Sequence, residues 1–497
     1  FTGGDVAEVD GITGASVGAG RTLEVSMDLA DALLDAGYTL HVDAAAEDMR
    51  DSPNEVALPL TAAVVLAFAS SAQAQSLAEM YGAARGYDAG FISAKAQFEA
   101  NLAKANQTLG GILPNIALSA SATRGYIDVR NDVGVSPDPR FFGTGVGAIT
   151  LSQPIYRPAA WAAYRQGGMQ LQQAAAQYEA AEQDLLVRVS QAYFDVLTSE
   201  DNLELVKAQK KAVGEQLASA KRNFEVGTAT ITGVRDAQAR FDLANAQEIS
   251  ADNDLRIKRL ALDLAVGLSN AKPKRLADNT KLIEPPADDV NTWVSQSESA
   301  SSAVRQAQLA LEIASLEVNK ANAGHKPTVD AQLSYAGARN VNGTSTTALA
   351  SSNHVFSPSA AVVLNVPLFA GFSTMYRVKE TVALQDKARA DYENARRSTA
   401  QATRTAYFGL VAGLSQVKAY EAAEASSQSA LDANKLGYSV GVNINIDVLN
   451  SQSQLYQTKR DLAKARYDVL VSNLKLRQAA GTLTPADLQP INDLLAP

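Results

Sequence analysis

The sequence predicts a mainly α-helical protein in which one large unit, two strands and a long helical hairpin, occurs twice. Gly227 and Gly441 lie 214 residues apart, and each stands between two long stretches with almost no Pro or Gly. The tripeptide Ala-Tyr-Phe at 192–194 returns at 406–408 with the same shift. Hydrophobic residues make up 46% of the chain but aromatic residues only 6%, which suits long helices packed closely on small side chains. We therefore expect a tandem duplication with a glycine at the tip of each helical hairpin.

Composition excludes several classes of protein. The chain has 497 residues and no cysteine, so it can hold neither a disulfide framework nor a thiolate metal site. Its three histidines are scattered without ligand spacing, and its formal net charge of −9 argues against nucleic acid as a partner. Carboxylates are common but lie mostly at solvated helical positions, and no catalytic constellation stands out. We therefore expect no enzymatic activity, no bound cofactor and no metal site.

Residues 1–55 differ in texture from the rest of the chain. The stretch DGITGAS at 10–16 resembles the motif on which a flavin transferase esterifies FMN to a threonine hydroxyl in exported flavoproteins, here Thr13. The segment is too small to bury a flavin alone. The alternative is a loop-and-strand fragment of a β domain, since residues 38–42 alternate like a strand.

Residues 56–74 form an apolar segment that ends in Ala72-Gln73-Ala74, the small-x-small pattern of a signal-peptidase site. The apolar run is too short for a comfortable transmembrane helix. The flank ahead of it is acidic, although a signal peptide usually has a basic one. A secretory signal would place the mature start near Gln75 and export the chain; the alternative is a buried apolar helix of an N-terminal domain.

Residues 75–270 are expected to form the first repeat, with residues 271–290 as a Pro-containing linker. The elements expected in order are a helix over 76–110, strands over 115–122 and 146–155, a helix over 159–224 and a return helix over 234–266. At 1.5 Å per residue the helix over 159–224 would span about 100 Å.

Residues 291–484 are expected to form the second repeat, followed by a tail over 485–497. Its expected elements are a helix to 323, strands over 328–337 and 355–368, a helix over 373–437 and a return helix over 447–480. In the second return helix large apolar residues recur every seventh position: Val448, Leu455, Leu462, Val469 and Leu476. The first return helix has the same column, interrupted by Glu248. This spacing predicts coiled-coil packing, which a long soluble coiled coil would explain equally well.

The strands distinguish these possibilities. Four strands per chain, arranged as two pairs distant in sequence, leave open edges that invite pairing with other chains. A barrel in a membrane must close to satisfy every backbone N–H and C=O group. Three chains would supply twelve strands, an even number within the bacterial range, together with twelve long helices to wall a tube. Other closures stay open on this argument alone.

The chain resembles the TolC family of outer-membrane channel-tunnel proteins over residues 76–490. The resemblance is carried by SQPIY at 152–156, Ala-Tyr-Phe at 192–194, VG at 226–227 with IT at 231–232, YSVG at 438–441 with IDVL at 446–449, RYDVL at 466–470 and AGTL at 480–483. It implies a homotrimer with a twelve-stranded outer-membrane β-barrel on a long periplasmic coiled-coil α-barrel. The linker and chain ends would form an equatorial belt. It further implies an exit duct for efflux or type I protein secretion, working with a periplasmic adaptor (membrane fusion) protein and an inner-membrane RND or ABC transporter.

The resemblance also assigns roles at the second hairpin tip. Asp447 matches an acid that projects into the closed periplasmic end, where three copies would form a cation-selective ring. Asn450 stands where the family often has a second acid, Asn443 where an Arg is common, and Gly233 where the first-half acid lies. Tyr438 matches an aromatic residue of the closing network. A first-turn carboxylate that satisfies free helix N–H groups is the alternative role for Asp447, and both can hold at once.

The two tips themselves are expected to dock the hairpin of the adaptor. The residues concerned are Val226, Gly227, Thr228, Val440, Gly441 and Val442. Two other functions remain open from the sequence: an exported flavin-carrying redox protein defined by residues 1–55, and a soluble coiled-coil scaffold.

Overall fold

The computed structural model describes residues 15–17, 23–25, 75–128, 130, 132, 138–228, 230–277, 289–344 and 351–496. The chain divides into two units, residues 1–73 and 74–497. In the first unit the described residues form two short antiparallel strands, β1 (Ala15–Val17) and β2 (Leu23–Val25). Thr13, the strand expected at 38–42 and the signal-like segment 56–74 lie outside the described residues, so the interpretations placed on them stay predictions.

The helices of the second unit follow the expected order. They are α3 (Leu77–Tyr87), α4 (Ala89–Leu109), α5 (Pro158–Glu225), α6 (Ile231–Val266), α7 (Val290–Ala300), α8 (Ser302–Asn322), α9 (Ser373–Ser439), α10 (Asn445–Ala480) and α11 (Gln489–Asn492), with 3₁₀ turns η1 (Ala323–His325) and η2 (Pro485–Leu488). No helix within the described ranges is long and apolar enough to cross a membrane.

Each expected helix that precedes a strand pair is broken once. The first break is at Asp88, where the backbone is extended and the carboxylate accepts a hydrogen bond from the Phe91 N–H at 2.7 Å. Arg188 of α5 forms an ion pair with the same carboxylate at 3.1 Å. The second break is at Ser301, which is also extended. The Asp88 side chain caps the restarted helix, as an Asp before a first turn commonly does. Ser301 makes no side-chain cap, so the second break is marked by its extended backbone alone.

The four strands form one antiparallel sheet in the order β3 (Asn115–Ile127), β4 (Arg140–Tyr156), β5 (Thr328–Val341) and β6 (Asn353–Asn365). We expected two separate pairs, and this was wrong, because β4 of the first repeat pairs with β5 of the second from Gly143 to Tyr156. Strands β3, β4 and β5 extend beyond the alternating stretches, since the backbone ladder continues through glycines that carry no pattern. Strand β6, expected over 355–368, begins two residues earlier and ends at Asn365. Among the described residues, no strand pairs with the outer side of the edge strands β3 and β6.

The two faces of this sheet differ sharply in chemistry. The register places these side chains on one face: Ile116, Leu118, Tyr126, Phe141, Ile149, Leu151, Leu333, Tyr335, Phe356, Pro358, Val362 and Leu364. All the large members of this set except Leu151 are strongly exposed, up to 78% for Leu118. The opposite face carries mainly small polar residues, Ser119, Ser121, Thr123, Thr144, Thr150, Ser334, Asn340, Ser357 and Ser359, together with the apolar Phe142, Val146, Val355 and Val363. An alternation of apolar and small polar residues is the pattern of strands with lipid on one side and water on the other.

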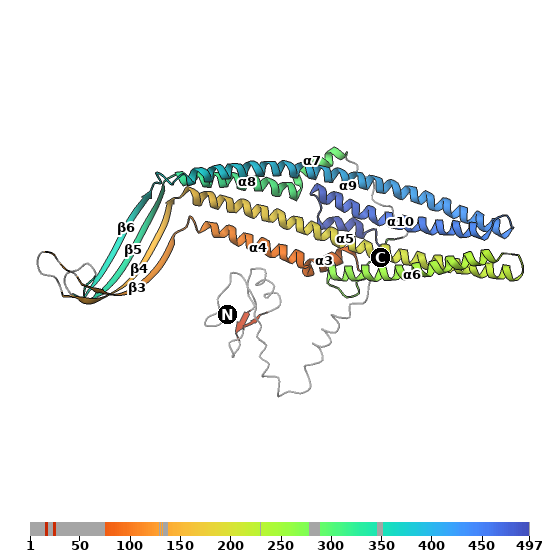
Figure 1. The fold of residues 1–497 in the computed structure, drawn as a ribbon, viewed down its shortest axis with the longest axis horizontal. Helices are drawn as coiled ribbons and strands as arrows, with labels where there is room; N and C mark the ends of the chain where they lie inside the picture. Colours follow the sequence, from red (N-terminus) through yellow and green to blue (C-terminus); the bar gives the residue numbers. More distant parts are fainter. Residues whose placement is uncertain are drawn as a thin grey trace, which may run out of the picture. The chain divides into compact units, whose positions relative to one another are not determined.

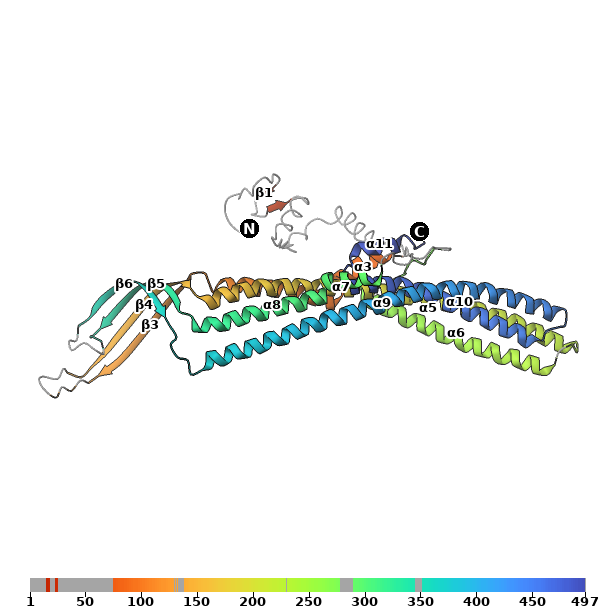
Figure 2. The same cartoon turned by 90° about the horizontal axis from the view of Figure 1, so that it is seen from above.

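Figures 1 and 2 show the strands at one end of the second unit and two helical hairpins, α5–α6 and α9–α10, ending together at the other. The predicted heptad column is the buried seam of the second hairpin, since each of its five members in α10 is at most 4% exposed. In the first hairpin Glu248, which interrupts the column, pairs with Lys210 of α5 at 2.8 Å. The interruption therefore replaces one apolar contact by an ion pair across the seam.

The middle of the unit holds the largest apolar core. Tyr193, Phe194 and Tyr467 pack there, and the Tyr193 hydroxyl donates a hydrogen bond to the Lys274 carbonyl of the linker at 2.8 Å. The described part of the linker also bonds to the C-terminal tail, because the Ala277 N–H donates to the Leu494 carbonyl at 3.0 Å. The linker and the tail thus share one belt around the helices.

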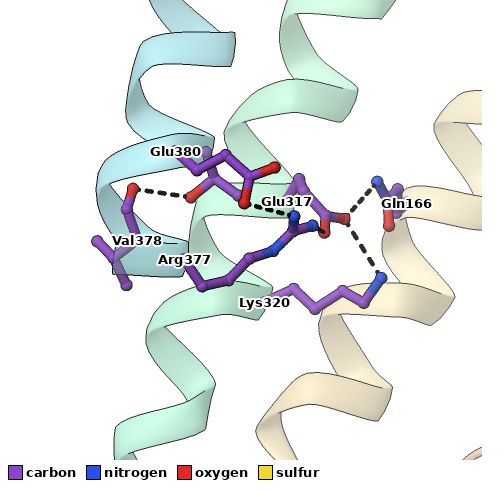
Figure 3. A network of polar contacts seen from close by, with 7 residues as sticks. Gln166, Glu317, Lys320, Arg377, Val378 and Glu380 are labelled. Carbon is purple, nitrogen blue, oxygen red and sulfur yellow. Dashed lines mark hydrogen bonds and ion pairs between the residues drawn. The ribbon is translucent and has the colours of Figure 1, made fainter. Parts of the chain in front are cut away.

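A polar network joins three helices between this belt and the sheet (Figure 3). Glu317 of α8 accepts hydrogen bonds from Gln166 of α5 at 3.1 Å, from Arg377 of α9 at 2.7 Å and from Lys320 at 3.3 Å. Burial alone would raise the pKa of Glu317, but these three donors outweigh it and the pKa is lowered. Charged Glu317 therefore holds both repeats together at this level.

Candidate functional site

The two hairpin tips share one backbone design. Gly227 has φ +76° and Gly441 has φ +81°, and a Cβ added to either would meet no atom within 4 Å. Glycine is needed there for its left-handed backbone and not for close packing. In each tip the chain closes back on the helix end: the Thr228 N–H donates to the Asn223 carbonyl at 2.8 Å, and the Val442 N–H donates to the Gly437 carbonyl at 2.9 Å.

The return helices begin with different caps. In α6 the Thr230 hydroxyl accepts from the Gly233 N–H at 3.4 Å. In α10 the Asp447 carboxylate accepts from the Ile444 N–H at 3.2 Å, while the Asp447 N–H donates to the Ile444 carbonyl at 3.1 Å. Asp447 therefore acts as a first-turn cap in the single chain. This capping role is compatible with a second role in a ring of three chains.

Polar side chains link the two hairpins of one chain near the tips. The Asn223 side-chain amide donates to the Tyr438 hydroxyl at 3.0 Å. Gln216 of α5 donates to the Asn445 side chain of α10. These contacts hold α5 of the first hairpin against α9 and α10 of the second.

A third link extends from α6. Arg240 donates to the Asn450 side-chain oxygen at 2.8 Å and, on its own helix, to Asp236 at 3.1 Å. Asn450 is thus held by a cation of the first hairpin. The second hairpin is also fastened internally, because the Asn443 amide donates to the Asn434 oxygen at 2.7 Å.

A groove of about 890 Å³ separates the two tips. Its wall includes Thr228, Gly233, Asp236, Tyr438, Gly441 and Asn443. Val440 also lines the groove, and all three tip valines are largely exposed, with fractions of 72% for Val226, 65% for Val440 and 78% for Val442. The tips therefore offer apolar side chains to solvent beside a polar groove.

Apolar clusters hold each hairpin together and also join the two hairpins. Within the first hairpin Val213 packs against Ala237, and within the second Leu431 packs against Leu455. Leu449 of α10, which is 1% exposed, packs into the cluster of the first hairpin, and amides, hydroxyls and an arginine add polar contacts between the hairpins. The two hairpins are therefore joined near their tips by apolar as well as polar contacts.

The structure thus brings the sequence-predicted tip residues Tyr438, Asn443, Asp447 and Asn450 to one end of the molecule. The sequence did not reveal the partners that hold them, chiefly Asn223, Asn434 and Arg240. An Arg four residues after an Asp on a helix gives only the signal of an ordinary surface pair. The contacts of Asn223 and Arg240 join residues more than 200 positions apart, which leave no local pattern in the sequence.

Comparison with protein families decides the relationship. The model of the outer membrane efflux protein family matches residues 80–268 and 293–482, which are the two repeats. The chain belongs to the outer membrane efflux protein family. The double match confirms the predicted duplication and the resemblance to TolC. A second model, described as a predicted periplasmic protein, matches residues 2–78.

Individual members of the outer membrane efflux family are similar over most of their length. The outer membrane protein TolC of Vibrio cholerae is 33% identical over 438 residues, 88% of this chain and 97% of the relative. The alkaline protease secretion protein AprF of Pseudomonas aeruginosa is 28% identical and covers 86% of this chain. The crystal structure of VceC from Vibrio cholerae has a TM-score of 0.69 at 18% identity, covering 82% of this chain and 96% of that one.

These findings confirm the predicted fold class, location and general function. The chain has the fold of a TolC-like channel-tunnel protomer, with four strands and a coiled-coil helical region. It is an exit duct of the Gram-negative outer membrane that extends into the periplasm. The predicted domain boundaries and tip roles are not tested by these comparisons.

Proposed function

We propose that three copies of the chain close into one duct, and that this duct works with a periplasmic adaptor and an inner-membrane transporter. The observation that carries the proposal is the four-stranded sheet with two unpaired edges, one apolar face and one small polar face. Joining β3 of one copy to β6 of the next removes every open edge. Three copies give twelve strands with the polar face inward, which is the arrangement of a water-filled membrane barrel.

The same threefold closure would gather three copies of the tip region at the periplasmic end. Asp447 would then contribute three carboxylates to a narrow entrance, which attract cations and raise their local concentration. The contacts of Asn223 with Tyr438 and of Arg240 with Asn450 hold the second hairpin against the first. In the proposed duct these contacts favour the closed entrance, because they fix the hairpin that carries Asp447.

The exposed tip valines support docking of the adaptor. Val226, Val440 and Val442 are largely exposed and project beside a groove of about 890 Å³. A helical-hairpin tip of a partner would cover the valines and fill the groove, as apolar anchors beside a polar rim do in protein interfaces. We propose that this is the adaptor's docking surface. The duct itself needs no catalytic group and no cofactor for passive transport.

The cargo is proposed at the level of class. AprF is named for secretion of alkaline protease, and the family is named for efflux. A duct of this design is compatible with export of small molecules by an RND transporter. It is equally compatible with export of proteins by an ABC transporter.

Planar-bilayer recordings test the role of Asp447. Because Asp447 also caps α10, two substitutions are needed: Asp447→Asn removes the charge but retains an oxygen for the Ile444 N–H, while Asp447→Ala removes both. Block of the current by divalent cations added on the periplasmic side should weaken about tenfold or more in both variants. The exposed helix residue Asp432 provides a matched control as Asp432→Asn. Undiminished block in Asp447→Asn would limit Asp447 to its capping role.

A further inference from the structure

Two arginines interrupt the apolar face of the sheet. Arg124 of β3 lies opposite Gly143 of β4, and Arg339 of β5 lies opposite Gly145. The register places both side chains on the same face as Phe141, and the Arg124 guanidinium is 5.8 Å from the Phe141 ring centroid. Both arginines are exposed, and neither forms an ion pair with any residue in the described ranges. Among the described residues, therefore, these two cations have no anionic partner.

Their height on the sheet places them at a membrane boundary. Eight residues separate Ile116 from Arg124, about 27 Å along a strand at about 3.4 Å per residue. With strands tilted by about 40°, this corresponds to about 20 Å of height in an apolar band about 25 Å tall. Arg124 and Arg339 lie near the last residues of β3 and β5, Ile127 and Val341. Figure 1 shows the sheet extending away from the helices toward these strand ends. Because the helices extend into the periplasm, this margin faces the outer leaflet, where a positive charge costs far less than at the midplane.

An apolar groove lies on the same face, closer to the membrane centre. It has a volume of about 470 Å³ and is lined mainly by Ile149, Leu151, Leu333, Tyr335, Pro358 and Ala360. Between the groove and the arginines the face is nearly bare. Gly147 would accept a Cβ with no atom within 4 Å, and a Cβ on Gly337 would only touch the Phe356 ring at 3.4 Å.

The groove and the arginines are spaced as the two ends of a lipid are. Six residues separate Leu333 from Arg339, about 20 Å along the strand, which is the reach of a fatty acyl chain. Tyr126 and Phe141, with ring centroids 5.1 Å apart, stand beside Arg124 at the height where aromatic residues border the lipid headgroups. Apolar groove, bare path and paired cations thus follow one another from the membrane centre outward.

We propose that this face binds a phosphorylated glycolipid of the outer leaflet, with phosphate on Arg124 and Arg339 and one acyl chain in the groove. Arginine suits this role because its planar fork donates two parallel hydrogen bonds to a phosphate group. A zwitterionic phospholipid would offer its phosphate beside its own cation and compensate the arginines less well. The inference rests on the barrel closure proposed above, since only a closed barrel turns this face to lipid.

The test is native mass spectrometry of the detergent-purified trimer with added lipid A, which carries phosphate groups on an acylated disaccharide. The double variant Arg124→Gln with Arg339→Gln should bind lipid A at least about tenfold more weakly than the unsubstituted protein does. A control that removes two exposed arginines of the helices, Arg256→Gln with Arg389→Gln, should bind like the unsubstituted protein. Gly147→Leu, which obstructs the path while leaving both arginines, should also weaken binding.

Further arms identify the ligand chemistry. Dephosphorylated lipid A and phosphatidylethanolamine should bind at least tenfold more weakly than lipid A, and millimolar inorganic phosphate should not displace it. The proposal would be overturned if the double variant bound lipid A as tightly as the unsubstituted protein does, or if the dephosphorylated lipid bound tightly. If inorganic phosphate displaced lipid A, the arginines would be assigned to a free anion instead. Only the trimer peak is scored, so an absent trimer in the unsubstituted protein contradicts barrel closure and not lipid binding. If the double variant does not form a trimer, lipid A binding is measured for Arg124→Gln and Arg339→Gln separately and judged by the same criteria.

Discussion

Replacing Gly441 by Ala isolates the backbone contribution to the second hairpin tip. A Cβ at this position meets no atom within 4 Å, so the substitution introduces no clash. Its cost arises from the backbone alone, because φ is +81° and an L-residue in the left-handed region is less stable by about 1–2 kcal/mol. A free energy of about 1.4 kcal/mol corresponds to tenfold in an equilibrium constant, so local opening of the tip should become about 5- to 30-fold more frequent.

Hydrogen exchange read by mass spectrometry measures this opening. The reporting amides are those that close the tip, including the Val440 N–H bonded to the Leu436 carbonyl at 3.1 Å and the Val442 N–H bonded to the Gly437 carbonyl. Their exchange should accelerate about 5- to 30-fold in Gly441→Ala, whereas peptides from the middle of α5 should be unchanged.

Gly168 provides the matched control. It lies inside α5, and a Cβ there also meets no atom within 4 Å. Gly168→Ala should therefore stabilise its helix by about 0.5–1 kcal/mol and slow local exchange. Unchanged or slower exchange at the tip of Gly441→Ala would contradict this account. It would mean that the left-handed backbone does not require glycine at this position.

Three further predictions concern the helices. Leu455→Ala removes a side chain that is 3% exposed in the seam of α9 and α10, and should lower the free energy of unfolding by about 2–5 kcal/mol. Leu455→Met nearly conserves the volume and should lower it by less than about 1.5 kcal/mol. Small and equal effects of both variants in thermal or denaturant unfolding would argue against a packed seam. Glu317→Gln should cost about 1–2 kcal/mol at neutral pH. Because the pKa of Glu317 is lowered in the folded protein, its charged form stabilises the fold above the ordinary carboxyl pKa. This stabilisation is lost as pH falls through the folded pKa, so the Tm difference between the variant and the unsubstituted protein should shrink in acid. A Tm difference that does not change with pH would contradict the network in Figure 3. Burial raises the pKa of Asp201, which accepts a hydrogen bond from the Tyr467 hydroxyl at 2.7 Å. The fold therefore loses stability as pH rises from the ordinary carboxyl pKa through the raised folded value. Over that interval Asp201→Asn should gain Tm relative to the unsubstituted protein, and a loss of Tm would reverse the assigned sign.

The long helices and their tips could be predicted because their signals are local. A glycine between two stretches nearly free of Pro and Gly marks a hairpin tip, and the seven-residue spacing through Leu455 and Leu462 marks the buried seam. The breaks at Asp88 and Ser301 were missed because a single capping residue scarcely alters a helical pattern.

The joining of the two strand pairs could not be read from the sequence. Strands β4 and β5 are separated in sequence by about 170 residues, from Tyr156 to Thr328, and paired glycines such as Gly147 opposite Gly337 carry no side-chain pattern. The tip residues were found by resemblance, yet their partners Asn223 and Arg240 were not. Hydrogen bonds between distant residues depend on how the helices pack, which no local periodicity encodes.

The central claim is that three copies join the edge strands β3 and β6 into one barrel. The chain has no cysteine, so introduced cysteines report without background. We would combine Ser121→Cys on β3 with single cysteines along β6 around Val355, oxidise the membrane fraction and separate the products on non-reducing denaturing gels. The account predicts that one register yields a reducible covalent trimer, while cysteines at other positions along β6 do not. Monomer alone at every position along β6 would contradict it.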